Sequence, residues 1–185
     1  MENVRDVVVL VGSLRKESFT RKVARFLAEV SPPSLKLEIV EIGQLSLYNQ
    51  DDEEHPSAAW TSFRHRIRAA HAVLFATPEY NRSIPGVLKN AVDVASRPYG
   101  ESAWDRKPGA VISVSPGAIG GFGANHHLRQ CLTYLNVPVM QQPEAYLGGA
   151  SKLFDSHGKL TNDSTREFLQ TFMNAFSSWI ERCST

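Results

Sequence analysis

Hydroxyl and basic side chains follow a short apolar run near the start of the sequence. Gly12 ends the run, Ser13, Ser18 and Thr20 bring hydroxyl groups, and Arg15 brings a cation. Ser18 stands where a helix N-cap is expected, and the N–H groups at a helix N-terminus favour an anion. The segment therefore predicts an anion site. Its small number of glycines suits a terminal monophosphate, which can be surrounded from several sides.

The same segment lacks the two glycine patterns that bind larger phosphate groups. It is not GxGxxG, which holds the pyrophosphate of a dinucleotide in Rossmann folds. It is not the P-loop pattern GxxxxGK[ST] either, because Glu17 stands where the second glycine is required. A pyrophosphate or a nucleoside triphosphate held in these two ways is therefore disfavoured. An ordinary capped helix with exposed Arg15 and Lys16 stays open as the alternative.

Two later segments also carry features of a ligand site. Residues 77–90 combine the aromatic side chain of Tyr80 with two prolines, of which Pro85 suits the first position of a helix. Such a stiff loop could receive a flat, polar heterocycle, and packing of Tyr80 back on the protein is the alternative. Residues 115–123 contain four glycines, which permit left-handed turns or a close approach of the backbone to a planar ligand. Here the alternative is a flexible strand-to-helix turn.

Each of these three segments follows an apolar run that predicts a β-strand. Short β-branched runs alternate along the chain with stretches of helical period, which indicates βαβ units and a parallel sheet covered on both faces. A flavodoxin-like α/β three-layer sandwich with strand order 2-1-3-4-5 is the commonest such arrangement, and it binds ligands at the carboxyl ends of its strands. Strands are expected at 7–11, 35–42, 72–76, 110–114 and 137–140 (extending at most to 146), helices at 19–30, 60–70, 87–95, 128–135 and 168–180, and polar loops at 48–57 and 96–108.

Composition and charge limit the class of protein. The chain has 185 residues, 42% of them hydrophobic, which predicts a single domain over residues 1–185. A net charge of +1 disfavours a binder of nucleic acid or of acidic membranes. The apolar run 7–11 is too short for a membrane span or a secretion signal. Two cysteines without ligand spacing predict a reducing, cytoplasmic location, and the adjacent His126 and His127 chelate poorly, so no metal site is expected.

The three motifs together resemble a known family. GSLRKESFTRK, TPEYN with SIPGVLKNAVD, and SPGAIGG are similar to the NAD(P)H-dependent FMN reductases of flavodoxin-like fold, which include bacterial chromate and quinone reductases and related azoreductases. The resemblance covers nearly the whole chain, and it implies noncovalent FMN and a homodimer or homotetramer. It places the phosphate of FMN at Ser13, Arg15, Ser18, Phe19 and Thr20, and the isoalloxazine at Pro78, Glu79, Tyr80 and Asn81, with Ser115 and Gly117 at its other edge.

The chain departs from the family pattern at three positions. Thr20 stands where the family often has Asn, which keeps a side-chain donor. Close relatives often carry an aromatic residue at position 82 and Trp at position 94, where this chain has Arg82 and Val94. The last two departures concern the surface on the substrate side of the flavin.

The implied activity is a two-step transfer. A hydride passes from NAD(P)H to FMN, and electrons then pass to a quinone, azo, chromate or flavin acceptor. No catalytic side chain is assigned, because the cofactor carries the chemistry. Backbone N–H groups of residues 78–81 are expected to stabilise the reduced flavin, and Arg82 is expected to attract the phosphates of the nicotinamide nucleotide. Two alternatives stay open: a flavodoxin-type electron carrier without a nicotinamide site, although such carriers are usually acidic, and a non-flavin binder of a phosphosugar or nucleotide.

Overall fold

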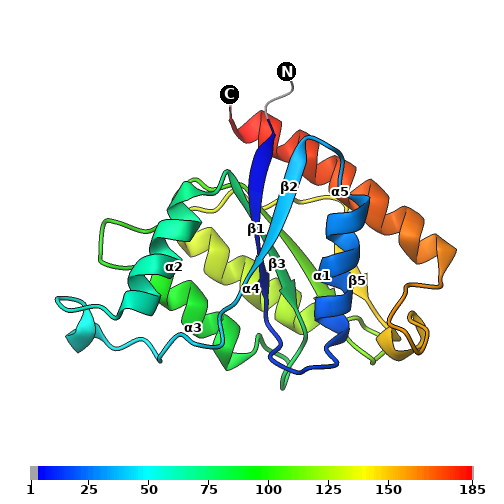
Figure 1. The fold of residues 1–185 in the computed structure, drawn as a ribbon, viewed down its shortest axis with the longest axis horizontal. Coiled ribbons are helices and arrows are strands. Elements are labelled where there is room, and N and C mark those ends of the chain that lie inside the picture. The colour runs from blue at the N-terminus through cyan, green and yellow to red at the C-terminus, as the bar shows by residue number, and fades with distance from the viewer. Residues whose placement is uncertain (1–3, 185) are drawn as a thin grey trace.

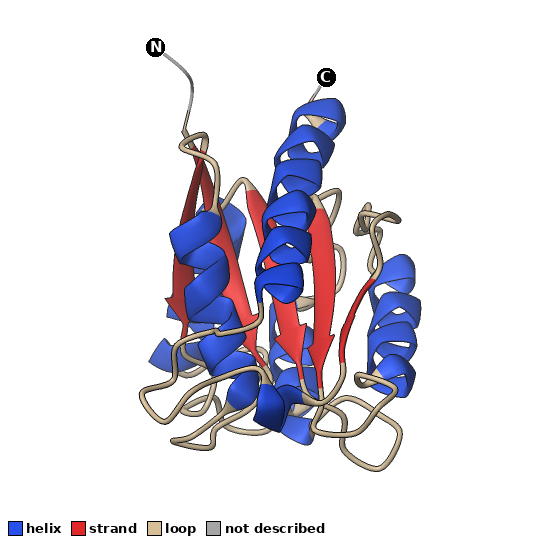
Figure 2. Ribbon diagram, turned by 90° about the vertical axis from the view of Figure 1, so that its right-hand side faces the viewer, coloured by secondary structure: helices blue, strands red, loops and turns tan. Residues whose placement is uncertain are grey.

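The computed structural model describes residues 4–184 and contains a parallel sheet between helices. Its strand order is β2-β1-β3-β4-β5, so the predicted flavodoxin-like α/β fold is confirmed. Figure 2 shows the strands between two layers of helices. The strands are β1 (Arg5–Val11), β2 (Leu35–Val40), β3 (Ala72–Thr77), β4 (Gly109–Val114) and β5 (Ala145–Leu147), and the helices are α1 (Phe19–Val30), α2 (Ala58–Ala69), α3 (Gly86–Ala95), α4 (Phe122–Tyr134) and α5 (Asp163–Cys183).

Two hydrophobic cores cover the two faces of the sheet. Side chains alternate along a strand, so Val7 and Val9 of β1 face one core while Val8 and Leu10 face the other. The first core is closed by α1 and α5, and the second by α2, α3 and α4. Figure 1 shows these two groups of helices on opposite sides of the sheet. Burial on both faces explains why β3 and β4 are apolar along almost their whole length.

The fifth strand differs from the prediction. Residues 137–140 form only an isolated bridge, because the N–H and C=O of Gly109 bond to the segment on either side of Val139, at 3.0 and 2.7 Å. The chain then leaves the sheet, and Pro143 has no N–H to give to a ladder. Pairing resumes at Ala145–Leu147, which is β5. The apolar run at 137–140 therefore pairs with the sheet at a single bridge and is not the fifth strand.

The carboxyl ends of the strands define one edge of the molecule. All strand arrows in Figure 2 point the same way, and long loops gather beyond their tips. The β1–α1, β3–α3 and β4–α4 loops therefore share this edge, next to the point between β1 and β3 where the strand order reverses. None of the helices between residues 4 and 184 is long and apolar enough to cross a lipid bilayer.

Candidate functional site

The β1–α1 loop begins close to the β3–α3 loop. The Gly12 N–H donates to Ala76 O at 2.8 Å, which extends the β1–β3 pairing by one residue. A Cβ at Gly12 would lie 3.1 Å from Leu88 Cδ2 and 3.2 Å from Pro78 Cδ, which is tighter than nine in ten real Cβ contacts. Glycine is favoured here because these side chains approach closely, and the backbone does not take a left-handed turn.

Several polar groups at the start of α1 are available to a ligand. Ser18 is the N-cap, as predicted, and its Oγ accepts a hydrogen bond from Arg21 N at 3.1 Å. Ser13 and Thr20 are buried, yet neither hydroxyl group has a hydrogen-bond partner among residues 4–184. Arg15 is exposed, and within the same part of the chain it forms no ion pair. Among the described residues only Arg64 Nη2 is a fully buried side-chain nitrogen or oxygen without a partner, so the Ser13 and Thr20 hydroxyl oxygens keep access to the surface and are free to donate to a bound acceptor.

The β3–α3 loop carries a tight hairpin at its tip. Tyr80 and Ser83 exchange two backbone hydrogen bonds of 2.9 Å, and Asn81 and Arg82 between them have φ of 51° and 65°. This is a two-residue turn in which both central residues are left-handed. Tyr80 is 48% exposed, so it does not pack back on the protein. The Tyr80 N–H is used within the hairpin, so the expected stabilisation of the flavin falls to other N–H groups of this loop.

Glu79 ties this hairpin to α4. One carboxylate oxygen accepts from the backbone N–H of Ala124 at 3.0 Å, and the other lies 3.2 Å from a guanidinium nitrogen of Arg82. A Cβ at Gly123 would lie 2.9 Å from the same Glu79 side chain. The Glu79 side chain therefore connects two loops of the site, and the pairing reduces the positive charge that Arg82 offers to a ligand.

The glycine-rich β4–α4 loop packs against the end of β5. Gly120 and Gly121 have φ of 62° and 77°, so they form the expected left-handed turns. A Cβ at Gly120 would lie 2.6 Å from the carbonyl carbon of Tyr146, which leaves no room for a larger residue. The Gly117 N–H donates to Ser115 Oγ at 3.1 Å, which holds the loop in a compact turn.

The loop after β5 is a part of this edge that the sequence interpretation missed. Ser115 N donates to Leu147 O at 2.9 Å, Ala150 N donates to Ser115 O at 3.1 Å, and Gly149 N donates to Gly117 O at 3.2 Å. The sequence pattern predicts the fifth strand at 137–140, before its true position at Ala145–Leu147. The loop after β5 therefore has no place in that prediction. The Gly148-Gly149 pair directly after an apolar triplet is the signal that could have indicated it.

A buried polar network supports the glycine-rich loop from below. The Asn125 amide donates to Ser113 Oγ at 3.3 Å and to Ala145 O at 3.2 Å. The Arg129 guanidinium donates to Asn125 Oδ1 at 2.9 Å and to Met140 O at 3.0 Å. These residues were not predicted, and only the i, i+4 spacing of Asn125 and Arg129 on one helix hints at their contact. The network links β4, β5 and α4.

Exposed aromatic side chains lie beside the loop. Phe122 is 50% exposed, and its ring centroid is 4.2 Å from His126 and 5.3 Å from Tyr146. His126 Nε2 and the Tyr146 hydroxyl are 2.8 Å apart. Burial and the nearby Glu144 carboxylate raise the pKa of Tyr146 to about 12. Tyr146 is therefore neutral at physiological pH and can take part in hydrogen bonding as a hydroxyl group.

Replacing Tyr146 by Phe is expected to change the response to alkaline pH. Because the folded state raises the pKa of Tyr146 from 10.0 to about 12, its contribution to stability is complete below pH 10 and is lost as the pH rises through 12. The free energy of unfolding should thus fall more steeply over this range in the parent protein than in Tyr146→Phe. Urea unfolding at several pH values measures this, with exposed Tyr134→Phe as control. Identical slopes for parent and Tyr146→Phe would contradict the assignment.

The chain is similar to known proteins over most of its length. Residues 5–152 match the family model described as NADPH-dependent FMN reductase. The chain belongs to this family. A quinone reductase of Pseudomonas putida is 64% identical over 98% of the chain and 97% of its own length. A 2-hydroxy-1,4-benzoquinone reductase of Burkholderia sp is 46% identical over 94% and 95%.

A solved structure agrees with this family assignment. FerB, a flavoenzyme NAD(P)H:(acceptor) oxidoreductase from Paracoccus denitrificans, superposes with a TM-score of 0.91 at 41% identity, over 97% of this chain and 98% of its own. This member of the FMN reductase family is an NAD(P)H-dependent oxidoreductase with FMN as cofactor. The prediction of reductase, cofactor and co-substrate is therefore confirmed, and the family match favours it over an electron carrier.

The loops of this FMN reductase fit the cofactor. The unpartnered hydroxyl groups of Ser13 and Thr20, the cap at Ser18 and the cation of Arg15 are the donors that a phosphate monoester requires. Among residues 4–184 no group of three or more His, Cys, Asp or Glu side chains could hold a metal ion.

Proposed function

We propose that this FMN reductase passes electrons from NAD(P)H to quinones, with the cofactor held at the carboxyl edge of the sheet. In this proposal residues 1–185 act as one unit. The observation that carries it is the pair of hydroxyl groups on Ser13 and Thr20, which have no partner among residues 4–184, keep access to the surface and flank the start of α1. The relatives named as quinone reductases support the acceptor class. Azo compounds, chromate and free flavins are further acceptors of the same proposal.

The β1–α1 loop is proposed to hold the phosphate of FMN. Ser13 and Thr20 donate from their hydroxyl groups, Arg15 supplies a charge-assisted bond, and the start of α1 at Ser18 and Phe19 supplies backbone N–H groups. Local donors are needed because the whole chain has a net charge of only +1 and creates no field that gathers anions.

The other two loops are proposed to hold the isoalloxazine. Pro78 and Asn81 of the β3–α3 loop lie beside the ring, with Glu79 holding the loop in place, and Tyr80 offers an exposed aromatic edge. Ser115 and Gly117 of the β4–α4 loop border the ring on its other side. Bound FMN supplies the redox chemistry, because it accepts a hydride from NAD(P)H and returns two electrons to an acceptor. Arg82, which is exposed at the hairpin tip, is proposed to contact the phosphates of NAD(P)H.

One site used in turn by both substrates gives a specific kinetic and optical result. The purified protein should be yellow, should lose its visible absorbance when NADPH or NADH is added without oxygen, and should regain it with a quinone. Steady-state double-reciprocal plots should be parallel. A colourless protein would favour a binder of another phosphate ligand, and a yellow protein that NADPH and NADH fail to bleach would favour an electron carrier. Intersecting plots would exclude a single shared site.

Replacing Arg15 by Ala is expected to weaken FMN binding by about 1.5–3 kcal/mol, the usual worth of a hydrogen bond to a charged group. Arg15 is exposed, so the fold should be unaffected. Fluorescence titration of FMN measures the change. Lys36→Ala removes one positive charge near the amino end of β2, at the opposite end of the sheet, and serves as the control. Equal affinity in Arg15→Ala and the control would remove Arg15 from the site.

The proposal also includes self-association of the chain and a cytoplasmic location. Phe122 and Tyr134 of α4 are 50% and 86% exposed, and exposed aromatic side chains on one helix suit a subunit contact. We expect a homodimer or homotetramer, which light scattering would detect. Cys131 and Cys183 are free, which agrees with a cytoplasmic location.

A further inference from the structure

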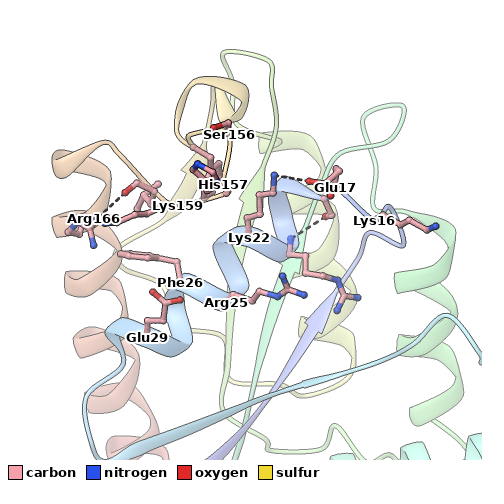
Figure 3. A pocket seen from close by; sticks show the side chains of 15 residues that line it. Lys16, Glu17, Lys22, Arg25, Phe26, Glu29, Ser156, His157, Lys159 and Arg166 are labelled. Carbon is pink, nitrogen blue, oxygen red and sulfur yellow. Dashed lines mark hydrogen bonds and ion pairs between the residues drawn. The ribbon is translucent and has the colours of Figure 1, made fainter.

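A second concave surface lies beside the predicted phosphate loop, on the outer side of α1. This basic cleft has a volume of about 630 Å³ and is formed by residues 16–18 at the end of the β1–α1 loop, by α1, by the loop of residues 154–160 and by the start of α5 (Figure 3). It therefore shares Ser18 with the proposed phosphate site of FMN. Its volume is in the range of sites that bind nucleotide-sized ligands. It is separate from the proposed isoalloxazine site, because no residue of the β3–α3 or β4–α4 loop lines it.

The cleft concentrates positive charge in a protein that is almost neutral. Six cationic side chains line it against the two carboxylates of Glu17 and Glu29, whereas the whole chain has 20 basic and 19 acidic residues. The six are Lys16, Arg21, Lys22, Arg25, Lys159 and Arg166, and His157 adds an imidazole.

Three of these six cations have an ion-pair partner: Arg21 pairs with Glu41 at 2.6 Å, Lys22 with Glu17 at 3.0 Å and Arg166 with Asp163 at 3.9 Å. The other three, Lys16, Arg25 and Lys159, are exposed and form no ion pair within residues 4–184. Arg25 and Lys159 interact only at longer range with the carboxylates of Glu41 and Asp155. Figure 3 shows Arg25 on α1 and Lys159 on the opposite loop, so the free charges lie on both walls of the cleft.

The outer wall of the cleft is a structured loop. Asp155 Oδ1 accepts hydrogen bonds of 2.9 Å from His157 N and Lys159 N. Phe154 stacks on Phe19 with ring centroids 6.3 Å apart. Arg166 donates to Leu160 O at 2.8 Å. These contacts hold the backbone of the loop from which the exposed Lys159 side chain extends.

The inner wall adds apolar surface. Phe26 and Leu160 are buried and line the cleft with Phe154, and the Arg166 guanidinium lies 5.0 Å from the centroid of the Phe26 ring. Cations on two walls with apolar side chains between them suit a phosphate joined to a sugar or a base better than a bare ion. The concave shape favours a small molecule over an extended polyanion.

We propose that the basic cleft binds a phosphate monoester on a nucleotide-sized ligand, as a second anion site beside that of FMN. Two sources carry this group: the ribose 2′-phosphate of NADPH, or a separate phosphorylated metabolite. The NADPH source rests on the proposed function. It has a direct consequence for coenzyme choice, because NADH lacks the 2′-phosphate and would gain nothing from the cleft.

The test uses FMN-saturated protein, so that the β1–α1 loop is already filled. Calorimetric titration with adenosine 2′,5′-bisphosphate and with inorganic phosphate compares the parent with the double variant Arg25→Ala and Lys159→Ala. The control is the charge-retaining double variant Arg25→Lys and Lys159→Arg. We expect the bisphosphate to bind about tenfold or more weakly to the alanine variant, since two charge-assisted contacts are lost. Binding to the control should change little, and added salt should weaken binding to the parent.

Kinetics with the two coenzymes then identify the source of the phosphate. A raised KM for NADPH with an unchanged KM for NADH assigns the cleft to NADPH. Unchanged KM values for both coenzymes, with bisphosphate binding still lost, assign it to a separate phosphorylated ligand. Equal bisphosphate affinity in parent, alanine variant and control would overturn the proposal. The binding measurement does not depend on turnover, so failure of the reductase proposal would be seen separately.

Discussion

Gly120→Ala is expected to weaken FMN binding by about tenfold or more and to lower the free energy of unfolding by roughly 2–4 kcal/mol. Two costs combine at this position. The backbone has φ of 62°, which disfavours any L side chain, and the new Cβ would lie 2.6 Å from the carbonyl carbon of Tyr146. Because neither backbone segment is a flexible side-chain end, the β4–α4 loop must move away from β5.

Gly149→Ala provides a closely matched control. Gly149 has φ of 61°, almost the same as Gly120, but a Cβ there would meet no atom within 4 Å. In this variant the free energy of unfolding should therefore fall by only about 1 kcal/mol, the cost of a side chain in this backbone conformation, and the FMN affinity should be kept. Flavin titration and urea unfolding measure both quantities. Equal losses in the two variants would show that the close contact with Tyr146 has no role.

Trp104→Ala is expected to lower the free energy of unfolding by about 3–5 kcal/mol, the usual cost of removing a large aromatic side chain from a core. Trp104 is fully buried, and its Nε1 donates to Val92 O at 2.8 Å. Its ring lies 5.6 Å from Phe75 of β3 and 6.3 Å from Phe63 of α2. The change would leave a cavity, and the carbonyl of Val92 would lose its partner.

Tyr99→Ala is the control for this substitution. Tyr99 lies in the same connection between α3 and β4 but is 88% exposed, so its loss should change stability by no more than about 0.5 kcal/mol. Urea unfolding followed by far-ultraviolet circular dichroism compares the two. A loss below about 1 kcal/mol for Trp104→Ala would contradict its role in the core.

Sequence patterns were sufficient for four of the five strands and for the presence of the five helices. Buried strands such as β1, β3 and β4 are apolar on both faces, so their positions follow from composition alone. The N-cap at Ser18 could also be predicted, because its hydroxyl group accepts a hydrogen bond from the first turn of α1. The cap depends on residues close in sequence, and the strands are recognisable because burial on both faces leaves continuous apolar runs.

Features that depend on distant contacts could not be predicted. The 96–108 connection looks polar, yet Trp104 within it reaches the core across α2 and β3. The run at 137–140 is as apolar as a strand, but its pairing is confined to Gly109. In the site, the hydrogen bond from the Ala124 N–H on α4 to the Glu79 carboxylate joins residues 45 positions apart. In each case the contacted residues lie far away in the sequence, so the local pattern does not reveal the contact.

The two outer strands of the sheet determine how copies of this chain can associate. β2 carries the exposed charged side chains of Lys36 and Glu38, and β5 pairs over only three residues after Pro143. Short or charged edge strands disfavour the addition of a strand from another molecule. Edge-to-edge association of two folded sheets is therefore disfavoured, and helix and loop surfaces are the better candidates for contacts between copies.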